Sequence, residues 1–180
     1  MKYQQINNSH LTEKISLRLK YLPSQDNIKV LDCFNGDGII WNKIKNKVKK
    51  NIEITPIEIK QKKGIYLKGD NIKYLMSLDL NKFDIIDLDA YGIPFAQLEI
   101  IFNKKFKNKI IYFTFIQSVM GKLPNKLLIK LNYSKEMIIK CPTIFNKNGF
   151  EKICNYIALN QIKNISYINI NNKYYCCIKT

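Results

Sequence analysis

The sequence predicts a single α/β domain whose sheet is mostly parallel, ends in an antiparallel hairpin and carries helices on both faces. Short apolar runs typical of strands alternate with helical segments, which is the pattern of parallel βαβ units. Near the end of the chain, two further strand-like runs are joined by Asn171-Asn172. Asparagine tolerates the positive φ that a two-residue hairpin turn needs, so these two runs are expected to pair antiparallel.

The chain has 180 residues, a length that fits one domain, and it contains no repeat or Pro/Gly/Ser-rich linker. We expect one domain over 1–180, with an N-terminal helical segment over 1–23 and a core over 24–180. The first helix, over 9–22, is expected to stop at Pro23 because proline cannot continue a helix.

The other expected elements follow the apolar pattern along the chain. Strands are expected over 28–34, 54–59, 65–68, 83–88 and 109–116, and helices over 39–48, 95–106 and 147–162. The closing hairpin is expected to join Ile165–Ile170 to Lys173–Lys179.

The net charge of +16 is the most prominent feature of the composition. Lysines that neutralise phosphates release counterions, so the charge favours a nucleic-acid partner. The other interpretation is codon bias, because the basic residues are almost all lysine, with Arg18 the single arginine, and Asn and Ile are abundant. Bias of this kind does not explain why acids are so few, which favours the first interpretation.

The sequence predicts a cytoplasmic protein without a membrane partner or a metal. No apolar run approaches the roughly 20 residues that span a bilayer, and the N-terminus lacks the layout of a secretory signal. The cysteines form no C-x-x-C pair, and His10 cannot complete a zinc set with them. We expect all five to be reduced and buried: Cys33, Cys141, Cys154, Cys176 and Cys177.

A loop with two glycines is expected directly after the first strand, where residues 30–38 read VLDCFNGDG. Glycine allows a tight turn and lets a ligand approach the backbone closely. Asp32 stands at the carboxyl end of the strand, where α/β sheets bind ligands. A dinucleotide site is the competing interpretation, but Trp41 takes the place of the third glycine in G-x-G-x-x-G.

These residues resemble the V-L-D-x-F-x-G-x-G pattern of class I (Rossmann-like) S-adenosylmethionine-dependent methyltransferases, whose sheet also ends in an antiparallel hairpin. The resemblance implies S-adenosyl-L-methionine as the cofactor, with Asp32 accepting a hydrogen bond from the methionine ammonium. The implied cofactor-binding residues are Asp32, Phe34, Gly36, Gly38, Glu58, Asp70, Asn71 and Asp87.

Three acids of that set have alternative roles. Glu58 is expected to accept hydrogen bonds from the ribose hydroxyls, and otherwise is a surface charge. Asp70 lies in a Gly-Asp-Asn step that resembles the family's contact to adenine, and it could equally cap the helix that follows. Asp87 is expected beside the methionine or the substrate, with a purely structural role as the alternative.

The connection between the second and third strands departs from the family. Only residues 59–64 separate them, whereas a parallel crossover usually needs a dozen residues or more. Either the usual helix is reduced to a turn there, or one of the two strands is misplaced.

The most informative stretch is 83–94, FDIIDLDAYGIP, in which an apolar strand ends in two acids, an aromatic residue and a glycine. It resembles the D-x-D-P-F-G-x-P motif of the tRNA guanine-N2 dimethyltransferase family. The resemblance covers about 28–97 and implies transfer of a methyl group to an exocyclic amino nitrogen of a base, RNA favoured over DNA and guanine N2 over other positions. Ala90 stands where that family has proline.

The residues of this stretch suit that chemistry. The Asp89 carboxylate and the Ala90 carbonyl could accept the N–H bonds of the target amine, Tyr91 could stack on the base, and Gly92 leaves room for it. Asp89, Ala90 and Tyr91 are therefore the catalytic candidates. Tyr91, Gly92, Gln117 and Lys122 are the substrate-binding candidates.

Other functions stay open at this point. The chain could methylate the amino groups of DNA bases or a protein side chain, although it is short for an enzyme with a DNA target-recognition domain. It could also be a binding module that keeps the fold without catalysis, which Ala90 and the short second crossover would explain. The oligomeric state does not follow from the sequence.

Overall fold

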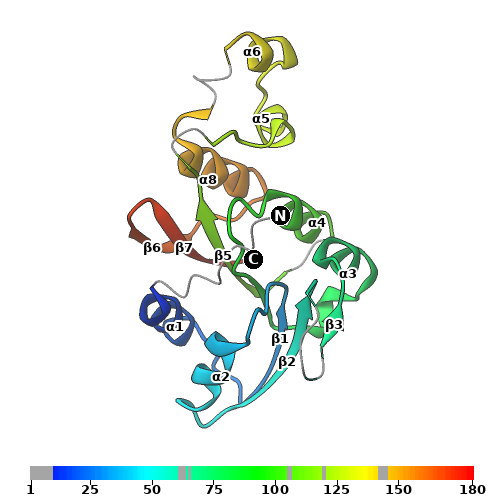
Figure 1. Cartoon of the computed structure of the whole chain (residues 1–180), viewed down its shortest axis with the longest axis vertical. Helices are drawn as coiled ribbons and strands as arrows, with labels where there is room; N and C mark the ends of the chain where they lie inside the picture. The colour runs from blue at the N-terminus through cyan, green and yellow to red at the C-terminus, as the bar shows by residue number, and fades with distance from the viewer. Residues whose placement is uncertain (1–9, 61–63, 65, 105–106, 119–120, 142–145) are drawn as a thin grey trace.

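The computed structural model describes residues 10–60, 64, 66–104, 107–118, 121–141 and 146–180, which form one seven-stranded sheet with helices around it (Figure 1). The strand order is β3-β2-β1-β4-β5-β7-β6. The strands are β1 (Asn27–Asp32), β2 (Asn51–Glu58), β3 (Leu67–Lys68), β4 (Ile85–Leu88), β5 (Ile110–Ile116), β6 (Ile165–Ile170) and β7 (Lys173–Lys179). The first five pair in parallel, and β7 runs antiparallel to both β5 and β6. The predicted fold class is confirmed.

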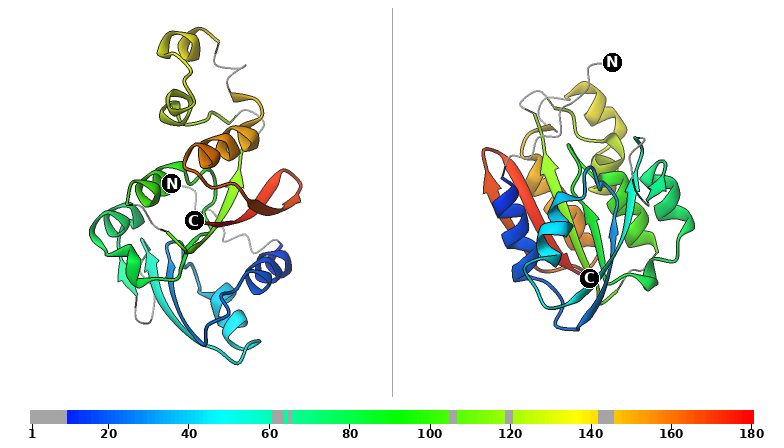
Figure 2. Two further views of the ribbon diagram at one scale, coloured as in Figure 1. Left: turned by 180° about the vertical axis from the view of Figure 1, so that it is seen from behind. Right: turned by 60° about the horizontal axis from the view of Figure 1, so that its bottom comes forward.

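Helices cover both faces of the sheet, as Figure 2 shows. The described helices are α1 (Leu11–Lys20), α2 (Ile39–Lys45), α3 (Asn71–Ser77), α4 (Phe95–Asn103), α5 (Asn125–Lys130), α6 (Lys135–Lys140), α8 (Gly149–Leu159) and the 3-10 helix η1 (Leu80–Lys82). Helices α1 and α2 pack on one face, and α3, α4 and α8 on the other.

The alternation of side chains along the buried strands produces two cores. Val30 and Ile85 point toward α1 and α2, whereas their neighbours Leu31 and Ile86 point toward α3, α4 and α8. Both faces of β1 and β4 are therefore apolar where the two strands pair, which is why apolar residues stand next to each other in the sequence at Val30-Leu31 and Ile85-Ile86.

The order of strands reverses between β1 and β4, which lie side by side although β2 and β3 come between them in the chain. Ligands of open α/β sheets bind outside the carboxyl ends of the strands at such a switch point. The fold therefore directs attention to the residues that follow β1 and β4.

Several element boundaries differ from the sequence prediction. Strand β2 begins at Asn51 because the polar residues before 54 still pair with β1, and the helix predicted over 39–48 ends at Lys45. Strand β4 begins at Ile85 because the Phe83 N–H donates to the Leu80 carbonyl in the turn before it. Some ends of the predicted elements lie outside the described residues: residue 9 of the first helix, residue 65 of the third strand, and residues 105 and 106 of the helix predicted over 95–106.

The short second crossover is confirmed, and both strands are in place. Strands β2 and β3 pair in parallel through Ile57↔Leu67 and Glu58↔Lys68. Of the connecting residues that the structure describes, which are 59, 60, 64 and 66, none is helical. Glu58 is the last residue of β2, and Asp70 follows the end of the neighbouring β3 by two residues, as the sequence predicts.

A pair of short helices after β5 was not predicted. Helices α5 and α6 project beyond the end of the sheet (Figure 1) and have six residues each, too few to show a clear helical periodicity. Leu127, Leu128 and Ile138 are buried, while the neighbouring Ile139 is 76% exposed.

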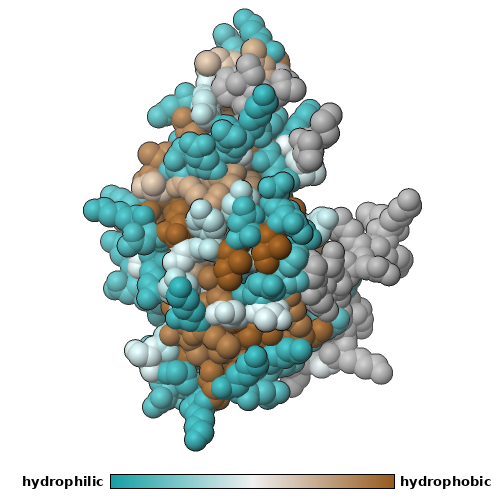
Figure 3. Space-filling model, turned by 90° about the vertical axis from the view of Figure 1, so that its left-hand side faces the viewer, coloured by the Kyte–Doolittle hydropathy of each residue, from teal (hydrophilic) through white to brown (hydrophobic). Residues whose placement is uncertain are grey.

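Two further expectations concern the surface and the cysteines. No helix in the described ranges is long and apolar enough to cross a membrane. Cys33, Cys176 and Cys177 are buried as predicted, but Cys154 is half-buried and Cys141 is exposed at the end of α6, so the prediction of burial was wrong for Cys141. Figure 3 shows a face with mainly hydrophilic side chains around separate apolar patches.

The hairpin turn provides a test of the backbone geometry. Asn171 and Asn172 both have positive φ, 51° and 59°. A β-branched residue is strained in this conformation, so Asn172→Val should lower the free energy of unfolding by about 1–2 kcal/mol, whereas Asn172→Gly should leave it unchanged or raise it. Urea denaturation measures both; equal midpoints for the valine variant and the wild type would contradict the turn.

Candidate functional site

One pocket lies at the carboxyl ends of β1, β2, β3 and β4, with a volume of about 810 Å³. This volume falls in the range of about 300–1,000 Å³ that is usual for ligand sites. Ten of the predicted site residues line it: Asp32, Phe34, Gly36, Glu58, Asp70, Asn71, Asp87, Asp89, Ala90 and Tyr91. Because parallel strands end at the same edge of a sheet, residues scattered over 32–91 meet in one place.

The loop between β1 and α2 forms one wall of the pocket. Gly36 and Gly38 have φ of 54° and 68°, a left-handed conformation that favours glycine. The Gly36 N–H donates to Glu58 Oε2 at 3.0 Å, which ties the loop to the end of β2. Gly38 precedes the first residue of α2 and lies behind the pocket wall rather than among its lining residues.

Asp32 is a buried carboxylate at the end of β1, with 5% of its surface exposed. Within the described residues, its hydrogen-bond donor is the Phe34 N–H, at 3.2 Å from Oδ1. Burial raises the pKa of Asp32 well above its usual value, and the charge of Asp87 raises it further. The carboxylate would be stabilised by a cation from outside the chain, because burial penalises the charged form.

The acids after β2 and β3 already hold the backbone around them. Glu58 accepts from the Gly36 N–H and, through Oε1, from the Lys60 N–H at 3.0 Å. Asp70 caps α3 by accepting from the Ile72 N–H at 2.9 Å, which was one of its two predicted roles. A carboxylate offers about four lone-pair positions, so both acids keep acceptor capacity toward the pocket.

Asn71 links the walls of the pocket. Its side-chain amide donates to the Cys33 carbonyl at 3.0 Å and accepts from Gln97 Nε2 at 3.0 Å. Gln97, on α4, also lines the pocket and was not predicted.

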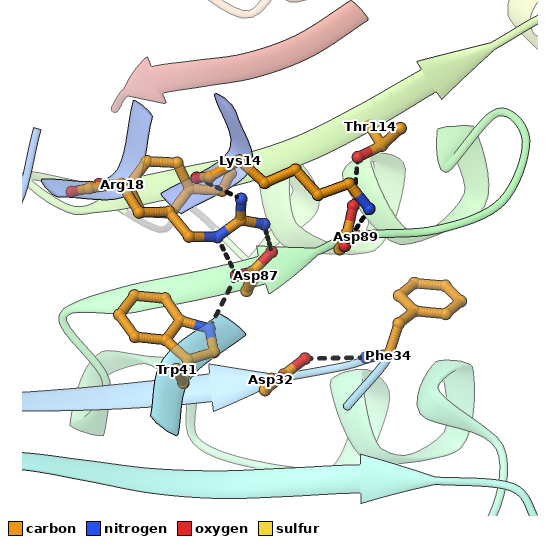
Figure 4. A network of polar contacts seen from close by, with 9 residues as sticks. Lys14, Arg18, Asp32, Phe34, Trp41, Asp87, Asp89 and Thr114 are labelled. Carbon is orange, nitrogen blue, oxygen red and sulfur yellow. Dashed lines mark hydrogen bonds and ion pairs between the residues drawn. The ribbon is translucent and has the colours of Figure 1, made fainter. Parts of the chain in front are cut away.

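Asp87 forms a buried network with α1 and α2, shown in Figure 4. Arg18 donates to both of its oxygens, Nε to Oδ2 and Nη2 to Oδ1, each at 2.7 Å, and Trp41 Nε1 donates to Oδ2 at 2.8 Å. Although burial alone would lower the pKa of Arg18, the charge of Asp87 and its hydrogen bonds raise it above the usual value. Asp87 lines the pocket, but its carboxylate is engaged by the protein itself.

Asp89 is held in a similar way, two residues further along. Lys14 Nζ donates to Oδ2 at 2.7 Å, and the Thr114 hydroxyl of β5 donates to Oδ1 (Figure 4). Burial would raise the pKa of Asp89, but the charges of Arg18 and Lys14 and the two hydrogen bonds outweigh it, and the pKa lies below its usual value. Asp89 is therefore ionised at neutral pH and can act as a hydrogen-bond acceptor.

The residues after Asp89 shape the mouth of the pocket. The Ala90 N–H donates to the Leu88 carbonyl at 2.7 Å, a bond that proline could not make. Tyr91 lines the pocket and is 70% exposed. Gly92 has φ of 128°, which requires glycine, and its carbonyl accepts from the Ile116 N–H, so the loop is fixed to the end of β5.

Three of the four substrate-binding candidates, Gly92, Gln117 and Lys122, are not among the residues that line the pocket. Gln117 donates through Nε2 to the carbonyls of Gly121 and Asn146 at 2.8 and 2.7 Å and so braces the base of the α5–α6 projection. Lys122 is exposed nearby. The substrate role of all three stays a prediction.

Sequence reasoning missed the contribution of α1. Lys14 and Arg18 lie four residues apart and so share one face of the helix, where they meet Asp89 and Asp87 of β4. The available signal was Arg18 itself, the single arginine of a chain rich in lysine. Within the described ranges, no group of three or more His, Cys, Asp or Glu side chains is arranged to hold a metal ion.

Comparison with known proteins adds information on the fold. The sequence matches no protein-family model and no curated protein. The structure resembles that of a SAM-dependent methyltransferase from Archaeoglobus fulgidus, with a TM-score of 0.58, 15% identity and 94% of each chain covered. It also resembles Trm1 from Pyrococcus horikoshii, solved with S-adenosyl-L-methionine, with a TM-score of 0.57, 15% identity and coverage of 94% of this chain and 54% of that one. The chain has the Rossmann-like methyltransferase fold.

The buried pair of Arg18 and Asp87 leads to a stability prediction. Both side chains are almost fully buried, so Arg18→Met leaves an unpaired charge and should lower the free energy of unfolding by about 3–5 kcal/mol. Arg18→Lys should lose less, because it keeps the charge but not the two-nitrogen geometry. Urea denaturation gives the order of the variants.

A matched double variant checks the cause of that loss. Arg18→Met combined with Asp87→Leu should recover much of the stability, since replacing both partners of a buried pair by apolar residues is often neutral. Wild-type stability of the single Arg18→Met variant would show that the pair does not stabilise the fold.

Proposed function

We propose that this chain is an S-adenosylmethionine-dependent methyltransferase that transfers a methyl group to an exocyclic amino nitrogen of a nucleic-acid base. One observation carries the proposal. A single pocket collects an acid from the end of each of three neighbouring strands, Asp32, Glu58 and Asp70, and sets the Asp89-Ala90-Tyr91 segment beside them.

The residues of the pocket fit this cofactor. Asp32 is buried and lacks a cation of its own within the described residues, because Arg18 is paired with Asp87 and Lys14 with Asp89. It would hold the ammonium of the methionine moiety. Glu58 would accept from the ribose hydroxyls, and Asp70 with Asn71 would contact the adenine. When bound, S-adenosylmethionine supplies an electrophilic methyl group on a sulfonium.

The chain's own residues would prepare the nucleophile. The lone pair of an exocyclic amine is conjugated with the base, so the amine is a poor nucleophile. The ionised Asp89 and the Ala90 carbonyl would accept its N–H bonds and direct the lone pair toward the methyl group. Tyr91, exposed at the pocket mouth, would stack on the base and hold it in line, so that positioning supplies much of the rate. A base within a duplex would first have to be flipped out.

RNA is the favoured substrate class, with guanine N2 as the favoured position, in the cytoplasm. The net charge of +16 suits a polyanion. The segment 87–94, DLDAYGIP, resembles the motif of the tRNA guanine-N2 dimethyltransferases, and one structural neighbour is Trm1.

A second candidate is a nucleic-acid-binding module that keeps the fold without catalysis. Ala90 in place of the family's proline and the short connection from β2 to β3 favour it. Labelled S-adenosylmethionine separates the candidates, because a module with a decayed pocket would bind none.

Mass spectrometry of nucleosides tests the proposal directly. Bulk RNA and bulk DNA are each incubated with the protein and S-adenosylmethionine, then digested. We expect a methylated guanosine from RNA. Methylated adenine or cytosine from DNA would identify DNA as the substrate. Methylation of a protein included as a control would identify a protein side chain, and not a base, as the methyl acceptor.

The loop provides a prediction for cofactor binding. Gly36 has positive φ, lines the pocket and would meet no side chain on gaining a Cβ, so Gly36→Val should leave the fold largely intact. Its branched side chain would strain the loop and enter the pocket, and we expect no binding of S-adenosylmethionine in calorimetry. Wild-type affinity would remove this loop from the cofactor site.

Asp89 and Tyr91 provide a prediction for catalysis. Asp89→Ala should cut kcat by about 100-fold or more while cofactor affinity stays nearly unchanged, because its hydrogen bond strengthens as the amine rehybridises. Tyr91→Ala should weaken substrate binding by about 1–3 kcal/mol, with Tyr91→Phe mild, since the ring provides the stacking. Steady-state kinetics and calorimetry measure these effects. If Asp89→Ala had the turnover of the wild type, the segment after β4 would be a loop that only caps α4.

A further inference from the structure

The side chain of Lys14 crosses from α1 to the pocket and ends on Asp89. Its Nζ lies 2.7 Å from Asp89 Oδ2, and the two side chains are only 14% and 12% exposed. Both residues line the pocket, and the Lys14 ammonium also lies 5.4 Å from the centre of the Tyr175 ring. A lysine on a solvated helix face would extend into water. This one is held at the carboxylate that the proposed mechanism uses.

The Asp89 carboxylate is fixed by a helix on one face of the sheet and by the strand next to β4. Lys14 of α1 donates to Oδ2 and Thr114 of β5 donates to Oδ1, so rotation about the last side-chain bond would break both contacts. Each oxygen has a second lone pair, which leaves an acceptor position open toward the pocket. The orientation of that position depends on Lys14 and Thr114 together.

The charges around Asp89 come from several elements. Helix α1 supplies Lys14 and Arg18, and β4 and β1 supply the acids Asp87 and Asp32. Strand β7 contributes Tyr175, whose phenol has its pKa raised to about 12 by burial and by the charge of Asp89, and Lys173 of β7 also lines the pocket. Arg18 is already paired with both oxygens of Asp87, so among the described residues Lys14 is the cation that contacts Asp89 directly.

We propose that Lys14 is a positioning residue that orients the Asp89 carboxylate as the hydrogen-bond acceptor for the target amine, so that α1 is part of the active site; this inference rests on the proposed function. The consequence is a division of roles within one helix. Arg18 stabilises the fold through its ion pair with Asp87. Lys14 orients the Asp89 carboxylate that would accept the hydrogen bond of the target amine.

Removing the ammonium has a predictable effect on the pH dependence. In the wild type, Lys14 and Arg18 hold the pKa of Asp89 below its usual value, and the acceptor is lost as the pH falls through that pKa. In Lys14→Met the pKa of Asp89 should rise, because burial persists while one cation is gone. The acid limb of the kcat profile should therefore move to higher pH.

The experiment compares Lys14→Met, Lys14→Arg and the matched control Lys20→Met, which removes an exposed lysine from the same helix. Carboxyl-carbon NMR of aspartate-labelled protein follows the titration of Asp89 without any substrate. We expect a higher pKa of Asp89 in Lys14→Met, recovery in Lys14→Arg and no change in Lys20→Met. With substrate, kcat of Lys14→Met should fall by up to about 100-fold, with KM for the cofactor unchanged, because a small misplacement of a functional group can cost that much.

The outcomes are distinguishable. An unchanged titration of Asp89 in Lys14→Met overturns the inference whatever the activity. A raised kcat/KM in that variant also overturns it, since Lys14 would then compete with the amine for Asp89. If the wild type methylates no substrate, the proposed function fails. A higher pKa of Asp89 in Lys14→Met, measured by NMR, would still show that Lys14 controls the protonation of Asp89.

Discussion

The two-nitrogen contact of Arg18 with Asp87 is the interaction on which the rest of the site depends. Strands β1 and β4 bring the acids Asp32, Asp87 and Asp89 to one water-poor edge of the sheet, where like charges repel and each is costly to bury. Arg18 neutralises the charge of Asp87, and Trp41 of α2 donates a further hydrogen bond to the same carboxylate. The same contact seats α1 on the sheet, which closes the core that α1 and α2 share and forms one side of the pocket.

The three acids differ in what remains for a ligand. Asp87 has its oxygens engaged by Arg18 and Trp41, and Asp89 is clamped but keeps a free acceptor direction. Asp32 has a backbone N–H and no cation among the described residues. Three aspartates of one pocket thus differ in role: Asp87 is a structural anion, Asp89 is an oriented hydrogen-bond acceptor, and Asp32 attracts a positive charge. The presence or absence of a neighbouring cation determines the role of each aspartate.

How far the sequence predicted this arrangement depends on the range of the interactions. The strands and the acids at their ends were predictable, because apolar runs mark buried strands and parallel strands share one carboxyl edge. The two positive-φ asparagines likewise predicted the hairpin. The contact between Arg18 and Asp87 spans 69 positions, and no local pattern specifies that α1 lies across β4. Helices α5 and α6 were missed because six residues make fewer than two helical turns, too few for a periodic pattern.

Arg18 is the single arginine in a chain whose other basic residues are lysine. Exchange of an arginine for a lysine has different consequences at different kinds of contact. Lysine carries the same charge, so a surface contact or a phosphate contact survives the change. A buried guanidinium that donates to both oxygens of one carboxylate cannot be replaced in this way, because an ammonium is a single point charge. Arg18 therefore occupies a position whose contact lysine would not reproduce.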